Sequence, residues 1–229
     1  RVREQLVRLN AQITGHRLLR GAIVPGGVTT RALPDAATIR QLAGDVAEIV
    51  ELALGHSVVR DRFSGTAILT AAQAQELGCL GYVARSSGVD LDARRTHPFH
   101  PATVGVARTT ATTGDVLARF QTRAQEVQAS ADLVTRLLEN APVGDQLAER
   151  PAGHGRSLRS GVGLVEGWRG TIVHRVELAE DGDTVTRLKV VDPSFLNWPA
   201  VPVALADTIV PDFPLTNKSF NLSYAGNDL

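Results

Sequence analysis

The residues best suited to chemistry lie in the segment Val165–Thr171, which reads Val-Glu-Gly-Trp-Arg-Gly-Thr. Arg169 carries a permanent charge and five N–H donors in a fixed plane, which suits it to polarising an oxygen atom or a small anion. Glu166 can accept or relay a proton if a pocket raises its proton affinity. The alternatives are structural. Arg169 would then be a salt-bridged arginine at a strand start, and Glu166 a solvated carboxylate at a strand end.

Sulfur and imidazole ligands are scarce in this sequence. Cys79 is the only cysteine, so neither a disulfide nor a cage of several thiolates can form within it, and a reducing, intracellular compartment is indicated. His97 and His100 flank Pro98, so no helix presents them together as metal ligands. His174 falls in a predicted strand, where we expect it to be hydrogen-bonded and partly buried.

A charged cluster precedes the longest predicted helix. Asp92, Arg94 and Arg95 stand close together in a polar stretch over residues 85–95, which we predict to be a loop. The three side chains are able to carry protons, contact a partner subunit or brace the loop. Bracing is the favoured interpretation, because exposed ion pairs are common and contribute little energy.

Helical periodicity predicts the elements that position these residues. A first helix covers residues 2–13, and a second runs from a cap at Asp35 to a stop at Gly55. Short helices are expected between residues 57 and 80, including one over residues 70–77.

The longest helix begins near Thr113 or Asp115 and continues until Pro142 blocks it. Residues 143–160 are predicted to be loop.

The pattern changes in the last third of the chain. Residues 171–178 alternate like a strand, an Asp181-Gly182 turn follows, and residues 185–191 return as a second strand. Prolines keep the helices of the tail short. The prediction is an α+β fold, a mostly helical bundle with a C-terminal β-hairpin and a winding tail.

Composition suits one globular domain over residues 1–229, with a helical part at 1–142 and the hairpin and tail at 161–229. Lys plus Arg equals Asp plus Glu, at 24 each, so no broad basic face for nucleic acid is expected. No apolar run approaches the roughly 18 residues of a membrane span, so we expect no direct span. The sequence opens at Arg1 without a leader, and we expect it to be a piece of a longer protein.

Five motifs follow one another in the order of a known family. They resemble the G-x-R…G-G-V/I, A-R-x-S-G…D-x-R-x-x-x-P-F/Y, G-D-V-x-A-R, V-E-A-P-R-G-E and P-S-F-x-N/N-N-W-P elements of nickel–iron hydrogenase large subunits and their complex I relatives. In the V-E-A-P-R-G-E element, Trp168 replaces the proline and Thr171 the second glutamate. The five motifs stand at 15–28, 85–99, 114–119, 165–171 and 193–199. The chain therefore resembles the C-terminal half of such a large subunit. It is similar to the hydrogenase-like, quinone-side component of NADH-quinone oxidoreductase, with variants of formate-hydrogenlyase and energy-converting-hydrogenase-related subunits.

The resemblance also indicates what has been lost. Hydrogenases of this family end with D-P-C-x-x-C, whose thiolates hold nickel and bridge to iron. Ser223 and Gly226 stand at the two cysteine positions, so no metal is expected in this chain. The resemblance implies that the former metal cavity is empty or accepts a quinone. Arg169 and Glu166 would line it, and the degenerate motif residues Asn221, Ser223, Gly226 and Asp228 would contact the ligand.

The resemblance implies a subunit of a membrane-associated redox complex, inactive as this fragment alone. Its expected partners are its own missing N-terminal half, a small subunit with an iron–sulfur cluster, and membrane subunits. The expected location is the cytoplasmic side, peripheral to the inner face of the cell membrane. The alternative is a non-catalytic structural or coupling subunit. A free-standing enzyme lacks support, because no triad, P-loop or dinucleotide motif is present.

Overall fold

The computed structural model describes residues 1–139, 141, 144, 146–148, 159–182 and 184–227. The chain divides into two compact units, residues 1–52 with 127–154, and residues 53–126 with 155–229. The predicted α+β class is confirmed, since helices and two small antiparallel sheets are both present. In the described part of the chain, no helix combines the length and the hydropathy that crossing a membrane requires.

The first unit contains the predicted N-terminal helices. Helix α1 (Val2–Thr14) ends at Gly15, which adopts a left-handed φ of 83°. Helix α2 (Ala36–Gly55) follows Asp35 as predicted. Between them, β1 (Ile23–Val24) and β2 (Gly27–Val28) pair with β3 (Gln146–Leu147) in a small sheet. Strand β3 lies in the stretch that was predicted to be loop. Two residues are too few to show alternation in a sequence.

The second unit begins with short helices, as predicted for residues 57–80. Thr70 caps α4 through a reciprocal capping box with Gln73. The prediction of a loop over residues 85–95 is wrong at both ends, because helices α5 and α6 occupy them. Their brevity, and the burial of charged Arg85 in place of an apolar residue, conceal them from a periodicity argument. The short elements are α3 (Ser57–Phe63), α4 (Ala71–Glu76), α5 (Gly81–Ser86), α6 (Ala93–Thr96) and η1 (Pro101–Gly105).

The longest helix, α7 (Val116–Leu138), begins where the sequence predicted. Asp115 precedes it, and the Asp115 carboxylate accepts a hydrogen bond from the backbone N–H of Ala118 at 2.7 Å. The first part of α7, up to Glu126, belongs to the second unit. This part of α7 carries Arg119, Arg123 and Glu126, which reach the site described below.

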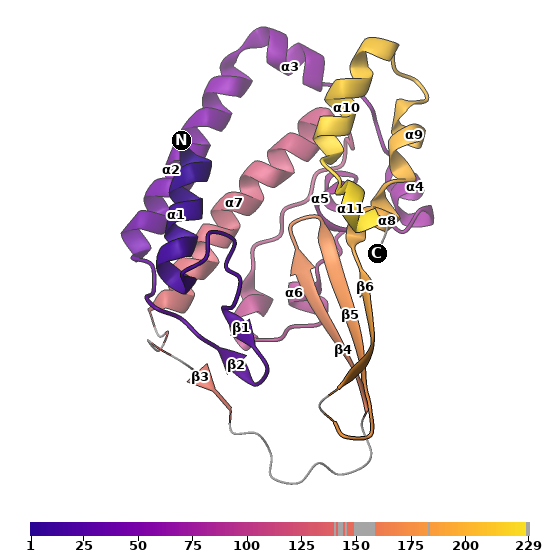
Figure 1. The fold of residues 1–229 in the computed structure, drawn as a ribbon. Helices are drawn as coiled ribbons and strands as arrows, with labels where there is room; N and C mark the ends of the chain where they lie inside the picture. Colours follow the sequence, from indigo (N-terminus) through magenta and orange to yellow (C-terminus); the bar gives the residue numbers. More distant parts are fainter. Residues whose placement is uncertain (140, 142–143, 145, 149–158, 183, 228–229) are drawn as a thin grey trace. The chain divides into compact units, whose positions relative to one another are not determined.

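A three-stranded antiparallel sheet, in the order β4-β5-β6, completes the second unit (Figure 1). The predicted hairpin of β5 (Gly170–Leu178) and β6 (Val185–Val191) is confirmed. Strand β4 (Ser160–Gly167) was not predicted, because its glycines lower strand propensity. The tail forms α8 (Pro193–Asn197), α9 (Ala200–Leu205), η2 (Val210–Asp212), α10 (Phe213–Phe220) and α11 (Tyr224–Asn227).

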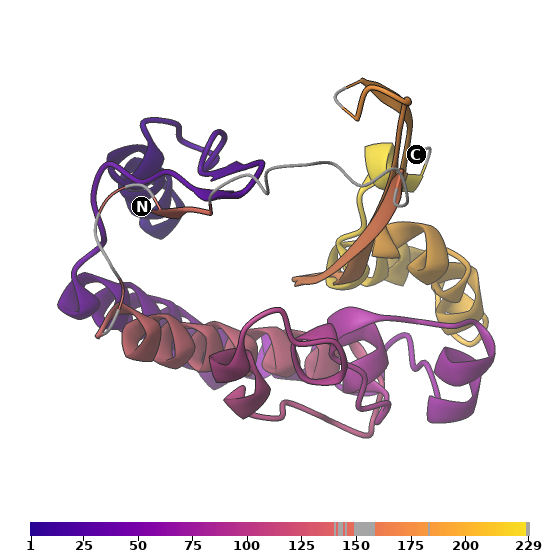
Figure 2. The ribbon, with the colours of Figure 1, turned by 90° about the horizontal axis from the view of Figure 1, so that it is seen from below.

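The tail helices gather at one end of this sheet, while its other end, towards the turn after β5, extends away from them (Figures 1 and 2). Helices α5 and α8 contact β5, and α6 contacts β4. The core of the unit lies among these helices and includes Leu69, Tyr82, Val83, Val116 and Phe220. The hairpin turn between β4 and β5 is therefore set directly against the core.

Two polar side chains are fully buried in this core. Tyr82 donates its hydroxyl to the carbonyl oxygen of Phe220. Arg119 donates to the carbonyl oxygens of Gly114 and Ala67 at 2.7 and 2.8 Å, and its guanidinium lies 4.3 Å from the centre of the Phe220 ring. Burial lowers the pKa of Arg119 to about 10, so the group remains a cation at neutral pH. These bonds tie α5 and α7 to the end of α10.

Alkaline pH should destabilise this unit through its buried acids. Burial raises the pKa of the Cys79 thiol to about 11 and, against the opposing nearby arginines, that of the Tyr82 hydroxyl to about 12. The unfolded chain loses these protons at lower pH, so stability is complete below about pH 9 and falls as pH rises towards 11. Between pH 7.5 and 10.5, Cys79 alone should cost roughly 2 kcal/mol of unfolding free energy.

Urea unfolding followed by tryptophan fluorescence measures this effect, since Trp168 and Trp198 both lie in the second unit. A Cys79→Ala variant should show a flatter pH dependence between pH 7.5 and 10.5 than the parent. Identical slopes in the two proteins would contradict the assignment.

Candidate functional site

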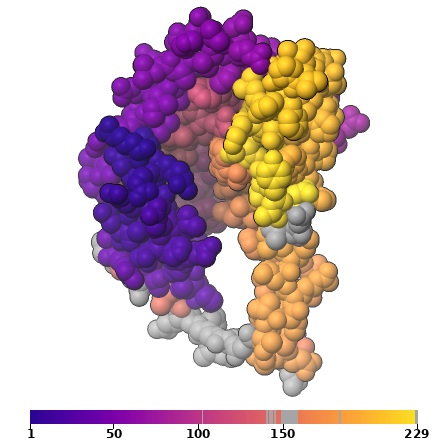
Figure 3. Space-filling model, turned by 45° about the horizontal axis from the view of Figure 1, so that its top comes forward, coloured from indigo at the N-terminus to yellow at the C-terminus, as the bar shows by residue number. Residues whose placement is uncertain are grey.

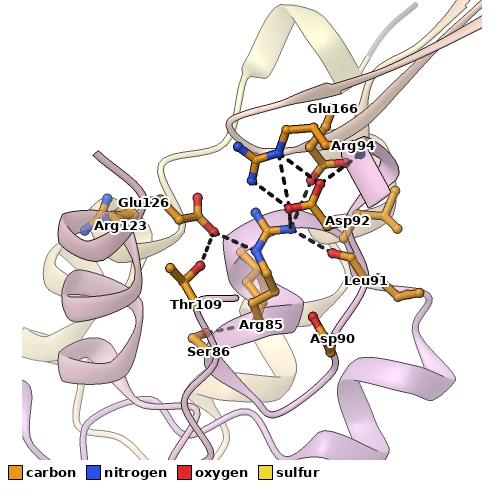
Figure 4. Close-up of polar contacts among 12 residues, drawn as sticks. Arg85, Ser86, Asp90, Leu91, Asp92, Arg94, Thr109, Arg123, Glu126 and Glu166 are labelled. Atoms are coloured by element: carbon orange, nitrogen blue, oxygen red, sulfur yellow. Dashed lines mark hydrogen bonds and ion pairs between the residues drawn. The ribbon is translucent and has the colours of Figure 1, made fainter. Parts of the chain in front are cut away.

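A buried ion cluster centres on Arg85 of α5 (Figure 4). Its Nε donates to Glu126 Oε1 at 2.6 Å, and its Nη1 donates to Glu166 Oε1 at 3.0 Å and to the carbonyl oxygen of Leu91 at 2.7 Å. The side chains of Arg85 and Glu166 are only 2% and 3% exposed. One guanidinium thus joins α7, the end of β4 and the loop before α6.

Glu166 has no unengaged oxygen. Besides Arg85, its carboxylate accepts hydrogen bonds from the backbone N–H of Ala93 at 3.1 Å and from the hydroxyl of Thr171 at 3.0 Å. It is therefore not the solvated strand-end carboxylate that formed the structural alternative. Its contacts anchor the start of α6 to the sheet.

The electrostatics of this cluster favour the charged forms. Burial acts to lower the pKa of Arg85, but the adjacent carboxylates of Glu126 and Glu166 outweigh it and raise that pKa above its usual value. Burial acts to raise the pKa of Asp92, and the guanidiniums of Arg94 and Arg85 reverse this and lower it. The cluster is accordingly held ionised.

Asp92 and its neighbours brace the loop, as the favoured interpretation had it. Asp92 accepts from the backbone N–H of Arg94 at 2.9 Å and caps α6, while the Arg94 guanidinium contacts both oxygens of the same carboxylate. Arg95 pairs with Asp90, which also contacts Arg108 at 3.2 Å. All three predicted side chains therefore hold local structure.

Arg169 lies in the turn between β4 and β5 and points away from this cluster to the tail. Its Nε donates to the carbonyl oxygen of Asn221 at 2.5 Å, and its guanidinium lies 5.2 Å from the centre of the Trp168 ring. Its two terminal nitrogens make no hydrogen bond to any residue that the structure describes. The tail thus lies beside the Arg169 turn, where the resemblance placed it.

The two former cysteine positions have structural contacts. Trp198 donates its indole N–H to the carbonyl oxygen of Ser223 at 3.2 Å, and the Ser223 hydroxyl accepts from the backbone N–H of Gly226 at 2.9 Å. A Cβ atom at Gly226 would lie 2.5 Å from the carboxyl carbon of Asp192. Asp192 itself caps α8 through the N–H of Ser194.

These contacts decide whether a nickel centre fits here. The donor set lacks sulfur at both positions, and the space that a side chain at 226 would need is filled by the Asp192 carboxylate. A serine hydroxyl is a hard, weakly acidic ligand that does not replace a thiolate. The tail residues therefore do not fit the nickel–iron centre of hydrogenases.

An aromatic and cationic group at the β4–β5 turn was missed by sequence reasoning. The Trp168 ring, 46% exposed, lies 5.1 Å from the Tyr82 ring and 5.9 Å from the Arg123 guanidinium. With Arg169 on its other contact, Trp168 is a half-exposed platform beside two cations. The replacement of the family proline by Trp168 was the available signal.

Asn197 was also missed, and it positions this turn. Its side chain accepts from the backbone N–H of Leu80 at 2.9 Å and donates to the carbonyl oxygen of Arg169 at 3.2 Å. The residue is fully buried, and its side-chain amide is hydrogen-bonded on both sides. The signal was its place in the 193–199 motif.

The predicted site residues therefore divide into two places. Arg169, Asn221, Ser223 and Gly226 belong to the turn and the adjoining tail. Glu166 belongs to the buried cluster around Arg85. Asp228 lies outside the described residues.

Comparison with known proteins identifies the family. The family described as "Respiratory-chain NADH dehydrogenase, 49 Kd subunit" matches residues 1–157, more than half of the chain. The chain belongs to this family. Membership agrees with the motifs, which predicted the shared hydrogenase and complex I lineage.

Individual relatives of this 49 kDa-subunit family carry related names. A subunit of the F(420)H(2) dehydrogenase of Methanosarcina mazei is 29% identical over 92% of this chain and 59% of its own length. Formate hydrogenlyase subunit 5 of Escherichia coli is 28% identical over all of this chain and 41% of its own length. The chain thus spans about half the length of these relatives.

A solved structure shares the fold. A chain of the membrane-bound sulfane sulfur reductase, an archaeal respiratory membrane complex, superposes with a TM-score of 0.82 at 21% identity. The match covers all of this chain and 65% of that one. At this identity the likeness establishes the fold alone.

Removing the Arg85 guanidinium should strongly destabilise the second unit. Arg85→Met leaves the Glu166 and Glu126 carboxylates without their buried cation, and breaking such a pair costs about 3–5 kcal/mol. The control is Arg159→Met. It removes an exposed ion pair with Glu180, whose side chains are 45% and 87% exposed, and should cost less than about 1 kcal/mol. Equal losses in urea unfolding would contradict the central role of Arg85.

A methyl group at Gly226 should meet Asp192. Gly226→Ala is expected to destabilise the unit by about 1–3 kcal/mol because of this overpacking. The matched control is Gly161→Ala, since a Cβ at Gly161 meets nothing within 4 Å. In an Asp192→Ala background the effect of Gly226→Ala should shrink markedly. An unchanged effect in that background would show that Asp192 does not fill the position.

Proposed function

We propose that this chain is part of a subunit of a membrane-associated redox complex, and that a quinone-type acceptor binds where hydrogenases hold nickel. The observation that carries the proposal is a sulfur-free tail held against Arg169, whose terminal N–H groups are not engaged by the described residues. The support from relatives is their kind. They are named as dehydrogenase, hydrogenase and quinone oxidoreductase subunits.

The chemistry of a quinone suits the residues at this turn. Two-electron, two-proton reduction to the quinol places negative charge on the carbonyl oxygens, and a guanidinium stabilises that charge through directed N–H donors. The half-exposed face of Trp168 offers a surface on which a planar ring stacks. Asn197 holds the backbone of this turn, so Arg169 needs little reorganisation to donate.

The Glu166 cluster has a different part in this proposal. Its carboxylate is saturated with hydrogen bonds and ion pairs, so we assign it the positioning of the turn and not contact with the acceptor. Arg169 is then the residue that contacts the acceptor. Glu166 acts through the geometry of the sheet.

The proposed partners follow from the family. An iron–sulfur cluster in a small subunit would supply electrons, membrane subunits would anchor the assembly, and the remainder of the same polypeptide would complete the subunit. The proposed location is peripheral, on the cytoplasmic face of the cell membrane. The relatives' names and the "membrane-bound" title of the structural neighbour support this assembly.

A structural or coupling subunit without a redox ligand is the second candidate. The observation that favours it is the packing role of both former ligand positions. Ser223 supports α11 through its bond to Gly226, and Gly226 makes room for Asp192. A position used for packing does not require a ligand.

Kinetics of the assembled complex with a water-soluble quinone analogue distinguish the two. Arg169→Gln should raise the KM for the analogue about tenfold or more, because it removes a charge-assisted hydrogen bond. Arg159→Gln, at an exposed arginine outside the turn, is the control and should leave the KM unchanged. If the parent complex shows neither turnover nor protection by a quinone analogue, the coupling role is correct. Stoichiometric nickel in the complex would overturn both proposals.

A further inference from the structure

The two faces of the β4–β6 sheet differ in chemistry. The register pairs Gly163 with His174 and His174 with Val190, so these three residues share a face. The opposite face carries the charged residues of the outer end, namely Arg175, Glu177, Arg187 and Lys189. The first, which we name the apolar face, consists of Gly161, Gly163, Val165, Ile172, His174, Val176, Leu188 and Val190. Lysine, arginine and carboxylates are missing from these eight residues.

This apolar face is open to solvent in the chain alone. Leu188 is 59% exposed and Val165 is 42% exposed. His174 is exposed as well, contrary to the expectation that it is partly buried. The sheet's outer end extends beyond the tail helices (Figures 1 to 3). A three-stranded sheet needs cover on its hydrophobic face to be stable, so an exposed face of this kind calls for a partner.

The glycines of β4 indicate how close that partner comes. A Cβ atom at Gly161 or Gly163 would meet nothing within 4 Å, so the fold of this chain does not itself require glycine there. Glycine within a strand costs stability, and a common reason for it is the close approach of another backbone.

The edge formed by β4 supports the same conclusion. Strand β4 is an edge strand of eight residues, and Glu166, its one charged residue, is buried in the Arg85 cluster. The other edge, β6, carries Arg187 and Lys189, the kind of charges that protect an exposed edge from wrong pairing. An uncharged edge is safe only when it is covered permanently.

We propose that the apolar face and the β4 edge are the docking surface for the part of this polypeptide that its longer relatives have and residues 1–229 lack. The relatives are long enough to supply it, since this chain accounts for only 59% and 41% of the two compared above. An uncharged apolar face is typical of permanent contacts and not of transient encounters. The inference rests on the proposed completion of the subunit by its own remainder, and it is independent of the electron acceptor.

Cysteine labelling of the full-length subunit in its complex tests this surface. Leu188→Cys places a thiol on the apolar face, and Val162→Cys places one on the opposite face at nearly the same exposure, 59% against 61% in this chain. The native Cys79 is 1% exposed and gives little background. The thiol at position 188 should react with a maleimide at least tenfold more slowly than the one at 162. Equal rates would overturn the proposal.

Two further measurements identify the occupant. A photo-cross-linker attached at position 188 should form an adduct with a peptide of the same polypeptide outside residues 1–229. An adduct with residues 1–52, with another subunit or with a second copy would overturn the assignment. Adding Gly163→Val should raise labelling at position 188 towards the rate at 162, because the new side chain has room on the sheet but blocks close approach. No change on adding it would also contradict the proposal. None of these readouts depends on acceptor turnover, so they stand or fail separately from the quinone site.

Discussion

The second unit depends on one buried guanidinium that neutralises two buried carboxylates. Arg85 joins Glu126 on α7 to Glu166 on β4, and all three are largely withdrawn from water. Taking such charges out of water costs several kcal/mol each, and only close pairing with further hydrogen bonds offsets this. Backbone and hydroxyl donors from Ala93, Thr171 and Thr109 provide those bonds. The cluster therefore specifies one relative placement of three segments that are far apart in sequence.

The tail is held by a different kind of interaction. Arg119 is buried without a carboxylate and is satisfied by the carbonyl oxygens of Ala67 and Gly114, the hydroxyl of Ser219 and the ring of Phe220. Together with Tyr82 it secures the end of α10, from which the segment with Ser223 and Gly226 continues. The former ligand segment therefore keeps its place through core contacts and does not need a metal to order it. This explains how a chain loses its thiolates without losing the local fold.

Sequence reasoning succeeded where a single period or a cap decides the structure. The ends of α1 and α2, the capping box at Thr70 and the β5–β6 hairpin are of this kind. It failed where tertiary contacts override local preference. Strand β4 is rich in glycine, and α5 buries an arginine that no periodicity rule counts as core. The candidate residues were found by motif, but their division into two places was not, because it depends on the turn between β4 and β5.

That turn separates two residues that the motif sets only three positions apart. Glu166 ends β4 on the face that packs against α6, where every oxygen is engaged, whereas Arg169 leaves the turn towards the tail with two nitrogens unengaged by the described residues. A saturated buried ion has little to offer a ligand, since each new contact would have to break an existing one. An anchored but incompletely bonded cation has both a fixed position and spare donors. Within one short motif, the fold thus assigns structure to the carboxylate and leaves ligand contact to the arginine.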